Sequence, residues 1–283
     1  MKLNQEQLDF WHTNGFLLLK NVLDSKQINC LKQAVDEVVQ THEQKETNTN
    51  TSRYHGKEYY NIHNPMDYTT DLDFLLDHQD TFDIALQLMG PYIQVMGCHV
   101  FVRHPSDAKN SNIGKFHTDS GPSLQQQIPD PENPALQLKF QYFLTDITED
   151  NASNFIAIPG SHRIRVTKPN LYCLLPECNQ YLEKGQMPPG AVQLKVNAGD
   201  VMIHALTLWH AVAPNLSPHS RKSISIRYGQ MWFQNYHFRL SEDRIKKLTR
   251  RQQRLLGRFS EARGDIHYRP PEDHLDIIYQ NML

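Results

Sequence analysis

The sequence predicts a mainly β fold with flanking α-helices. Two observations predict it. The first 91 residues carry apolar side chains at helical spacing, and residues 92–233 form short apolar runs separated by Gly, Pro, Asn and Asp. Several short strands in this order are typical of a β barrel or sandwich. A barrel of this size fits within one domain, so we expect a single domain, 1–283, with a helical segment 1–91, a β core 92–233 and a helical tail 234–283.

Helix signals occur on both sides of the core. We expect helices over Gln5–Asn14, from Asp24 or Ser25 onward, over Phe74–Met89 and over Ser241–Leu256. The second shows Ile28, Leu31, Ala34 and Val38 at helical spacing. Gly15, Gly90 and Gly257 follow the other three, as glycine commonly does at a helix end. The polar stretch Glu43–Lys57 predicts a loop, and we interpret 43–63 as a candidate lid over a substrate pocket.

The predicted strands are short and apolar. They comprise Phe16–Leu19, Ile93–Val102, Leu136–Leu144, Phe155–Ile158, Gln193–Val196, Val201–Leu208 and Lys222–Tyr228. The longest apolar runs, such as Phe16–Leu19, are too short to cross a bilayer.

Composition narrows the class of protein. The net charge of −2 does not favour attraction to nucleic acid or to an anionic membrane. The opening MKLNQEQLDFW has no apolar signal core, and the four cysteines show no CxxC spacing, so we expect a cytoplasmic protein without a disulfide framework. The arginines and lysines between Arg244 and Arg258 are interpreted as a solvated helix face.

Histidine is frequent, with 15 residues, and one histidine lies in a metal-binding pattern. In His117-Thr118-Asp119, residues i and i+2 of an extended strand point to the same side, so both can bind one ion. Such a triplet alone is more often a polar surface cluster. The other two triplets, at His78 and His274, lie in a predicted helix and near the chain end, whereas only His117 precedes a run of strands and several later histidines.

A distal histidine would complete a two-histidine, one-carboxylate group. His210 and His204 both qualify, and we prefer His210 because it stands five residues before Asn215 and eleven before Arg221. A strand, a turn and a returning strand would bring Arg221 back toward the metal. Its guanidinium is suited to hold a carboxylate through two parallel hydrogen bonds.

These residues resemble the phytanoyl-CoA dioxygenase family. The resemblance rests on Phe10–Phe16, Gly90-Pro91, Asn151, the run Phe155-Ile156-Ala157-Ile158-Pro159-Gly160-Ser161-His162, Gly199-Asp200, His210, Asn215 and Arg221, and spans roughly residues 7–230. It implies a double-stranded β-helix, that is, a jelly-roll or cupin-like core. It also implies Fe(II), 2-oxoglutarate and O₂ as cofactor and cosubstrates.

By the resemblance, His117, Asp119 and His210 hold the iron and Arg221 holds 2-oxoglutarate, with His99 as a further cosubstrate-facing residue. The chain departs from the family pattern after Asn151, where Ala152-Ser153-Asn154 replace a small residue, often glycine, and near Gln141, where some relatives have tryptophan. Tyr54, Tyr59, Tyr60 and His63 either line the pocket or serve packing. His162 is expected to be structural.

The function implied is oxidation, by default hydroxylation, of a small organic molecule in secondary metabolism or catabolism, with succinate and CO₂ as coproducts. Desaturation, cyclisation and endoperoxide formation use the same site. Asp119 argues against halogenation, because halogenating relatives have Gly or Ala there. A non-catalytic β-helix that binds a ligand is the alternative from another class. We expect a monomer or homodimer with a small-molecule substrate and no nucleic-acid or membrane partner.

Overall fold

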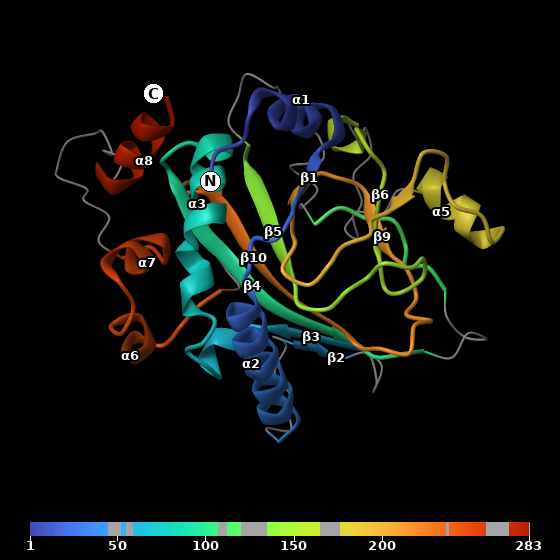
Figure 1. Cartoon of the computed structure of the whole chain (residues 1–283), viewed down its shortest axis with the longest axis horizontal. Coiled ribbons are helices and arrows are strands. Elements are labelled where there is room, and N and C mark those ends of the chain that lie inside the picture. Colours follow the sequence, from blue (N-terminus) through green and yellow to red (C-terminus); the bar gives the residue numbers. More distant parts are fainter. Residues whose placement is uncertain are drawn as a thin grey trace.

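The computed structural model describes residues 1–44, 52–54, 59–106, 112–119, 135–164, 176–235, 238–258 and 272–282. Two antiparallel sheets form the core of these residues, with orders β1-β8-β5-β10-β4-β3-β2 and β7-β6-β9 (Figure 1). The larger sheet contains β1 (Phe16–Leu19), β2 (Ser52–Tyr54), β3 (Tyr59–His63), β4 (Ile93–Arg103), β5 (Gln137–Phe143), β8 (Val201–Ala205) and β10 (Arg221–Gln230). The smaller contains β6 (Phe155–Ala157), β7 (Val192–Gln193) and β9 (His210–Val212).

Helices cover one side of the larger sheet. The α-helices described are α1 (Gln5–Asn14), α2 (Ser25–Gln44), α3 (Gln79–Met89), α5 (Pro176–Glu183), α6 (Glu242–Ile245), α7 (Arg250–Leu255) and α8 (Glu272–Met282). Three short 3₁₀ helices accompany them: η1 (Pro65–Asp67), η2 (Asp73–Asp77) and η3 (Ser161–Arg163). Figure 1 shows α2 and α3 on the side of the sheet away from β6 and β9. The result is the jelly-roll core, flanked by helices, that the sequence predicts.

The two faces of the larger sheet differ in chemistry, because side chains alternate along each strand. The apolar set packs in the main core with the helices: Val100 and Val102 of β4, Leu138 and Phe140 of β5, Ile224, Ile226 and Tyr228 of β10. The intervening residues face the smaller sheet: His99 and Phe101 of β4, Lys139 and Gln141 of β5, Arg221, Ser223, Ser225 and Arg227 of β10. Alternation therefore gives the sheet a polar inner face.

Two predicted helices are each interrupted. The helix expected over Phe74–Met89 consists of η2 and α3, separated by His78, whose backbone is extended (φ −53°, ψ 120°). The helix expected over Ser241–Leu256 consists of α6 and α7. Ser241 caps α6 as predicted, but Thr249 starts α7 anew, because its side chain accepts from the Gln252 N–H in a capping box.

The loop predicted over Glu43–Lys57 is wrong at its start and at residues 52–54. Helix α2 continues to Gln44, and β2 pairs with β3, which pairs with β4. Residues 45–51 and 55–58 lie outside the described residues. The segment 1–91 contains the strand expected at Phe16–Leu19, which is β1 at one edge of the larger sheet, and it also supplies β2 at the other edge, which was not expected. The strand expected over Gln193–Val196 is reduced to β7 and a single bridge between Val196 and Ile147.

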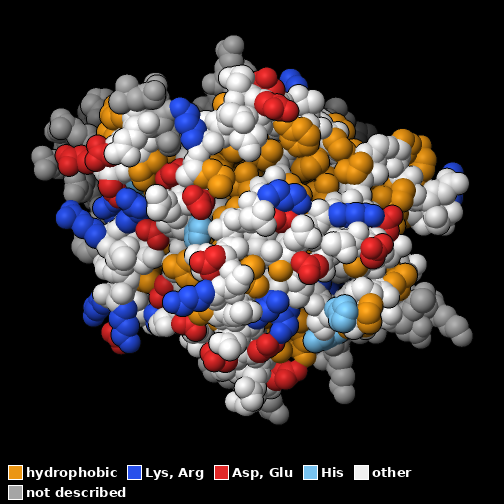
Figure 2. Space-filling view, in the orientation of Figure 1, with side chains coloured by type: hydrophobic (Ala, Val, Ile, Leu, Met, Phe, Trp, Pro, Cys, Tyr) orange, Lys and Arg blue, Asp and Glu red, His pale blue; other side chains and the backbone are white. Residues whose placement is uncertain are grey.

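Charged residues of both signs are interspersed on the face seen in Figure 2. The C-terminal arginines are paired with carboxylates: Arg244 with Asp73 (2.7 Å), Arg251 with Asp273 (2.7 Å), Arg254 with Asp273 and Arg258 with Glu242. Within the described part of the chain, no helix combines the length and apolar character needed to cross a membrane.

Candidate metal centre

His117 and His210 are directly opposite each other. The N–H of each donates to the carbonyl of the other, both at 2.9 Å, which forms an antiparallel bridge between the segment 112–119 and β9. Their rings lie 4.4 Å apart, centroid to centroid. Asp119 follows in a bend rather than in the extended strand expected, and its N–H donates to the Leu206 carbonyl (3.1 Å).

One ligand atom from each of these three residues converges on a single point. The atoms offered by His117, Asp119 and His210 all lie within 4.8 Å of one another. Asp119 Oδ1 is 3.8 Å from the Nε2 atoms of both His117 and His210. These separations fit one ion bound to two imidazoles and a carboxylate on one side, with the other positions open.

The orientation of both imidazoles is set by the backbone. His117 Nδ1 lies 2.8 Å from the Lys115 carbonyl, and His210 Nδ1 lies 3.0 Å from the Leu208 carbonyl. A carbonyl can only accept, so each Nδ1 carries the hydrogen and each Nε2 presents its lone pair toward Asp119. Burial, together with His117, holds the pKa of His210 well below its usual value, which keeps this ring neutral.

Lys139 contacts the second oxygen of the Asp119 carboxylate. Its Nζ lies 2.8 Å from Asp119 Oδ2, which leaves Oδ1 toward the histidines. Burial alone would raise the pKa of Asp119, but Lys139, His210 and His117 overcome it and hold that pKa well below its usual range. The sequence analysis did not single out Lys139. Lys139 precedes the buried Phe140 on β5, and because side chains alternate along a strand, Lys139 lies on the inner face.

His204 does not join the three ligand atoms, although its ring lies 5.2 Å from that of His210. Its Nδ1 contacts the Ala205 carbonyl (3.1 Å), and burial lowers its pKa to about 4. Phe155 stacks on His210 at 4.7 Å. His162 packs elsewhere, against Gly15 at the end of α1.

Arg221 lies at the start of β10, buried on the inner face. Its Nη1 donates to Ser153 O (3.1 Å) and its Nη2 to Ser223 Oγ (3.3 Å). The buried Nε has no partner, and no carboxylate of the described residues forms an ion pair with this guanidinium. Burial, with a contribution from Arg103, lowers the pKa of Arg221 to about 9. Asn215 stabilises the turn before β10, because its Nδ2 donates to the carbonyls of Arg103 and His219.

His99 lies on the inner face, where it stacks on His63 with ring centroids 4.0 Å apart. Burial, with the nearby charges of His63 and Lys139, holds the pKa of His99 well below its usual value. Tyr59 also faces inward, under Arg103 (4.1 Å), whereas Tyr60 is buried on the other side and donates to Glu43. The side chain of Tyr54 lies outside the described residues.

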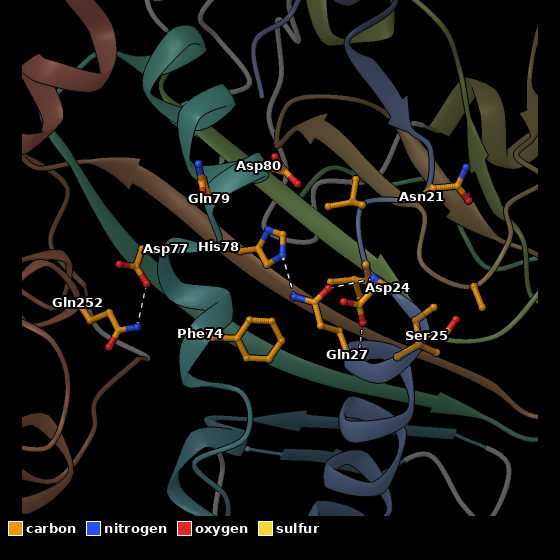
Figure 3. Close-up of a pocket in the computed structure, with 14 residues that line it drawn as sticks. Asn21, Asp24, Ser25, Gln27, Phe74, Asp77, His78, Gln79, Asp80 and Gln252 are labelled. Atoms are coloured by element: carbon orange, nitrogen blue, oxygen red, sulfur yellow. Dashed lines mark hydrogen bonds between the residues drawn. The ribbon is translucent and has the colours of Figure 1, made fainter. Parts of the chain in front are cut away.

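A cavity of about 80 Å³ lies beside the three ligand atoms, lined by His99, Asp119, Lys139, Ser225 and Arg227. A larger cavity, about 820 Å³, lies beyond the opposite side of the sheet, between the start of α2 and α3. Figure 3 shows that its polar groups, including Gln27, His78 and Asp77, come from the helical layer. It contains none of the predicted site residues, so the site chemistry belongs to the smaller cavity.

A jelly-roll core with two histidines and one aspartate around open positions is the arrangement of non-haem iron oxygenases. The model of the family described as phytanoyl-CoA dioxygenase (PhyH) matches residues 11–223. The chain belongs to this family, as the sequence motifs predict.

Curated relatives are distant. The chain is 23% identical over 267 residues to the dioxygenase FUM3 of Gibberella moniliformis, covering 89% of this chain and 81% of that protein. It is 26% identical over 143 residues to the uncharacterized protein Rv1501 of Mycobacterium tuberculosis, covering 49% and 47%. The match thus spans about half the length of the mycobacterial relative.

Solved structures share the fold. HygX from Streptomyces hygroscopicus, with nickel, 2-oxoglutarate and hygromycin B bound, superposes with a TM-score of 0.62 at 16% identity, over 83% of this chain and 90% of that one. The carbocyclase SnoK from nogalamycin biosynthesis gives 0.61 at 20% identity, over 81% and 84%. At these identities the similarity concerns the fold.

Proposed function

We propose that His117, Asp119 and His210 hold Fe(II), that Arg221 holds the distal carboxylate of 2-oxoglutarate, and that the enzyme hydroxylates a small organic molecule. The observation that carries the proposal is the convergence of three ligand atoms within 4.8 Å. Two imidazole nitrogens and one carboxylate oxygen are donors that suit Fe(II) and leave room for cosubstrate and O₂.

Arg221 supports the cosubstrate assignment through its charge. A buried guanidinium without a carboxylate partner is costly unless a ligand neutralises it. Nη1 and Nη2 hydrogen bond to Ser153 and Ser223, which fixes the plane of the group. Gln141 donates to the same Ser223 hydroxyl (3.0 Å). The rigid fork matches a carboxylate at a fixed distance from the metal ligands.

Iron with 2-oxoglutarate and O₂ supplies the oxidising chemistry, and the protein supplies position and shielding. The carbonyls of Lys115 and Leu208 fix the two imidazoles. Lys139 holds one oxygen of Asp119, so the other stays available to the metal. Phe155 shields one side of the His210 ring from water.

Asp119 determines which reactions are open. With iron and 2-oxoglutarate bound, Asp119 would be the third protein donor, and its carboxylate would take the position that a halide needs. Oxidation without chlorination is therefore expected. Epimerase and carbocyclase neighbours share this fold, and product analysis will separate hydroxylation from those outcomes. HygX was solved with hygromycin B bound, and SnoK comes from nogalamycin biosynthesis. These two neighbours favour a secondary metabolite as substrate.

The test is anaerobic Fe(II) titration followed by succinate detection with 2-oxoglutarate and O₂. One Fe(II) per chain and iron-dependent succinate are expected. Asp119→Gly should lose most succinate formation, because it removes a donor and a negative charge. Once a substrate is found, mass spectrometry in chloride buffer should show an oxygenated product. A chlorinated main product, or a wild-type protein that binds iron but never forms succinate, would contradict the proposal.

A further inference from the structure

Two cationic side chains are directly opposite each other beside the metal ligands. Arg227 of β10 pairs in register with Lys139 of β5, and both belong to the inner-face set. Like charges at directly opposed positions of an antiparallel pair are destabilising. A second negative charge nearby would remove that penalty.

Asp119 forms an ion pair with only one of the two, although its charge also acts on the other at longer range. Its carboxylate contacts Lys139 at 2.8 Å. Arg227 has no carboxylate partner among the residues that the structure describes, and its buried Nε has no hydrogen-bond partner there. Its half-buried guanidinium therefore has no ion pair of its own and shares the charge of Asp119 with Lys139.

Arg227 also hydrogen bonds to the backbone, but this bond uses only one of the nitrogens of its guanidinium. Nη2 donates to the Met96 carbonyl (3.0 Å), at the bulge where the β10–β4 register shifts between Arg227 and Tyr228. This bond anchors one nitrogen of the guanidinium and orients the others. A fixed fork with free donors is the form in which arginine binds carboxylate and phosphate groups.

The cavity lies where such a group would be held. It measures about 80 Å³ and is lined by Arg227, Lys139, Ser225, His99 and Asp119. This is too small for a whole organic ligand, which needs about 300 Å³ or more, but it admits an acidic end group. Arg221 is six residues away on the same strand, roughly 20 Å, so one 2-oxoglutarate molecule cannot use both arginines.

We propose that the substrate of this oxygenase carries an oxyanion group, a carboxylate or a phosphate monoester, and that Arg227 binds it in this cavity. Ser225 and His99 lie where they can add hydrogen bonds. The inference rests on the proposed function, because it assumes that Arg221 serves the cosubstrate.

The test uses enzyme loaded with Ni(II) and the unreactive analogue N-oxalylglycine. Hexanoate, hexyl phosphate and hexanamide are titrated by calorimetry into wild type, Arg227→Met and Lys222→Met. Lys222 is the matched control, since it lies on the same strand but contacts Asp36 on the other side (2.5 Å). We expect one anion to bind tighter than hexanamide, roughly ten- to a hundredfold, in wild type and Lys222→Met. The two anions distinguish carboxylate from phosphate.

In Arg227→Met this preference should disappear while Ni(II) and N-oxalylglycine still bind. Equal affinity of both anions and the amide in wild type would overturn the inference. So would a preference unchanged in Arg227→Met, because the metal itself would then be the anion site. Loss of N-oxalylglycine binding in Arg227→Met would assign this arginine to the cosubstrate instead. Failure of wild type to bind Ni(II) and N-oxalylglycine would overturn the proposed function with it.

Discussion

At the scale of single residues, the position of one ring nitrogen distinguishes the proposed distal metal ligand from its neighbour. His204 and His210 are both buried, and both place Nδ1 against a backbone carbonyl. Only His210 has its Nε2 at 3.8 Å from Asp119 Oδ1 as part of the converging group. The sequence favoured His210 through its distance to Asn215 and Arg221, and the geometry supports the same choice.

His210→Ala should therefore abolish Fe(II) binding at the stoichiometric site, and His117→Ala should do the same, because each removes an imidazole donor. His204→Ala is the matched control and should retain one metal per chain. The measurement is metal content after dialysis, with succinate formation as a second readout. The assignment would be reversed if His204→Ala lost the metal and His210→Ala kept it.

The proposed role of Arg221 can be tested separately from metal binding. Arg221→Met should raise the KM for 2-oxoglutarate about ten- to a hundredfold, since a charge-assisted hydrogen bond is worth about 1.5–3 kcal/mol. Metal content should not change. Arg103 is the control cation, because it lies opposite Arg221 in the sheet register but contacts Tyr59. A KM that responds to Arg103→Met and not to Arg221→Met would assign the cosubstrate to Arg103.

At the scale of elements, the turn Pro159–His162 connects the first helix to the proposed metal ligand His210. Gly15 ends α1 at φ +77°, and a Cβ there would lie 2.3 Å from His162 Nδ1. The neighbouring Ser161 Oγ accepts from the Trp209 N–H (3.0 Å), one residue before His210. The contact between α1 and this turn thus supports the backbone that carries His210.

Gly15→Ala should lower the free energy of unfolding by about 2 to 5 kcal/mol, from left-handed strain plus overpacking. Gly185→Ala, with φ +67° and nothing within 4 Å of its Cβ, is the control and should lose only about 1 kcal/mol. Urea unfolding measures both. Fe(II) affinity should also fall in Gly15→Ala only. Equal losses would show that the His162 contact does not matter.

The elements also show what sequence could and could not predict. Most strands followed from short apolar runs separated by turn residues, and the grouping of His117, Asp119 and His210 followed from residue spacing. Lys139 and Arg227 were missed, because their opposition depends on the β5–β10 register, which a single sequence does not encode locally. The breaks at His78 and Thr249 were missed because the apolar spacing continues across them, whereas local caps and tertiary contacts interrupt the backbone.

At the scale of the whole molecule, buried neutral histidines make stability depend on pH. Burial lowers the pKa of His162 and of His204 to about 4, and the pKa values of His99 and His210 are also lowered. An unfolded histidine titrates near 6.5. Below that value the unfolded chain binds protons that the folded chain excludes, so stability falls as pH falls from 6.5 toward 4.

The metal-free protein should thus lose about 1 kcal/mol for each of His162 and His204 between pH 7 and 5.5. The low pKa of Asp119 does not act in this window, because its stabilising charge is lost only below the usual carboxyl range. Urea unfolding at both pH values measures the difference. His162→Gln should reduce it by about 1 kcal/mol, and the exposed His219→Gln should not. A pH-independent stability would refute the burial argument.

The backbone bridge between His117 and His210 has one more consequence. The amide hydrogen of each ligand residue is bonded to the carbonyl of the other, so neither can exchange with solvent unless the two segments separate. Separation would also pull apart two of the three proposed metal donors. Hydrogen exchange at these two amides therefore reports the opening of the metal centre itself, and a bound ion should slow both by the same factor.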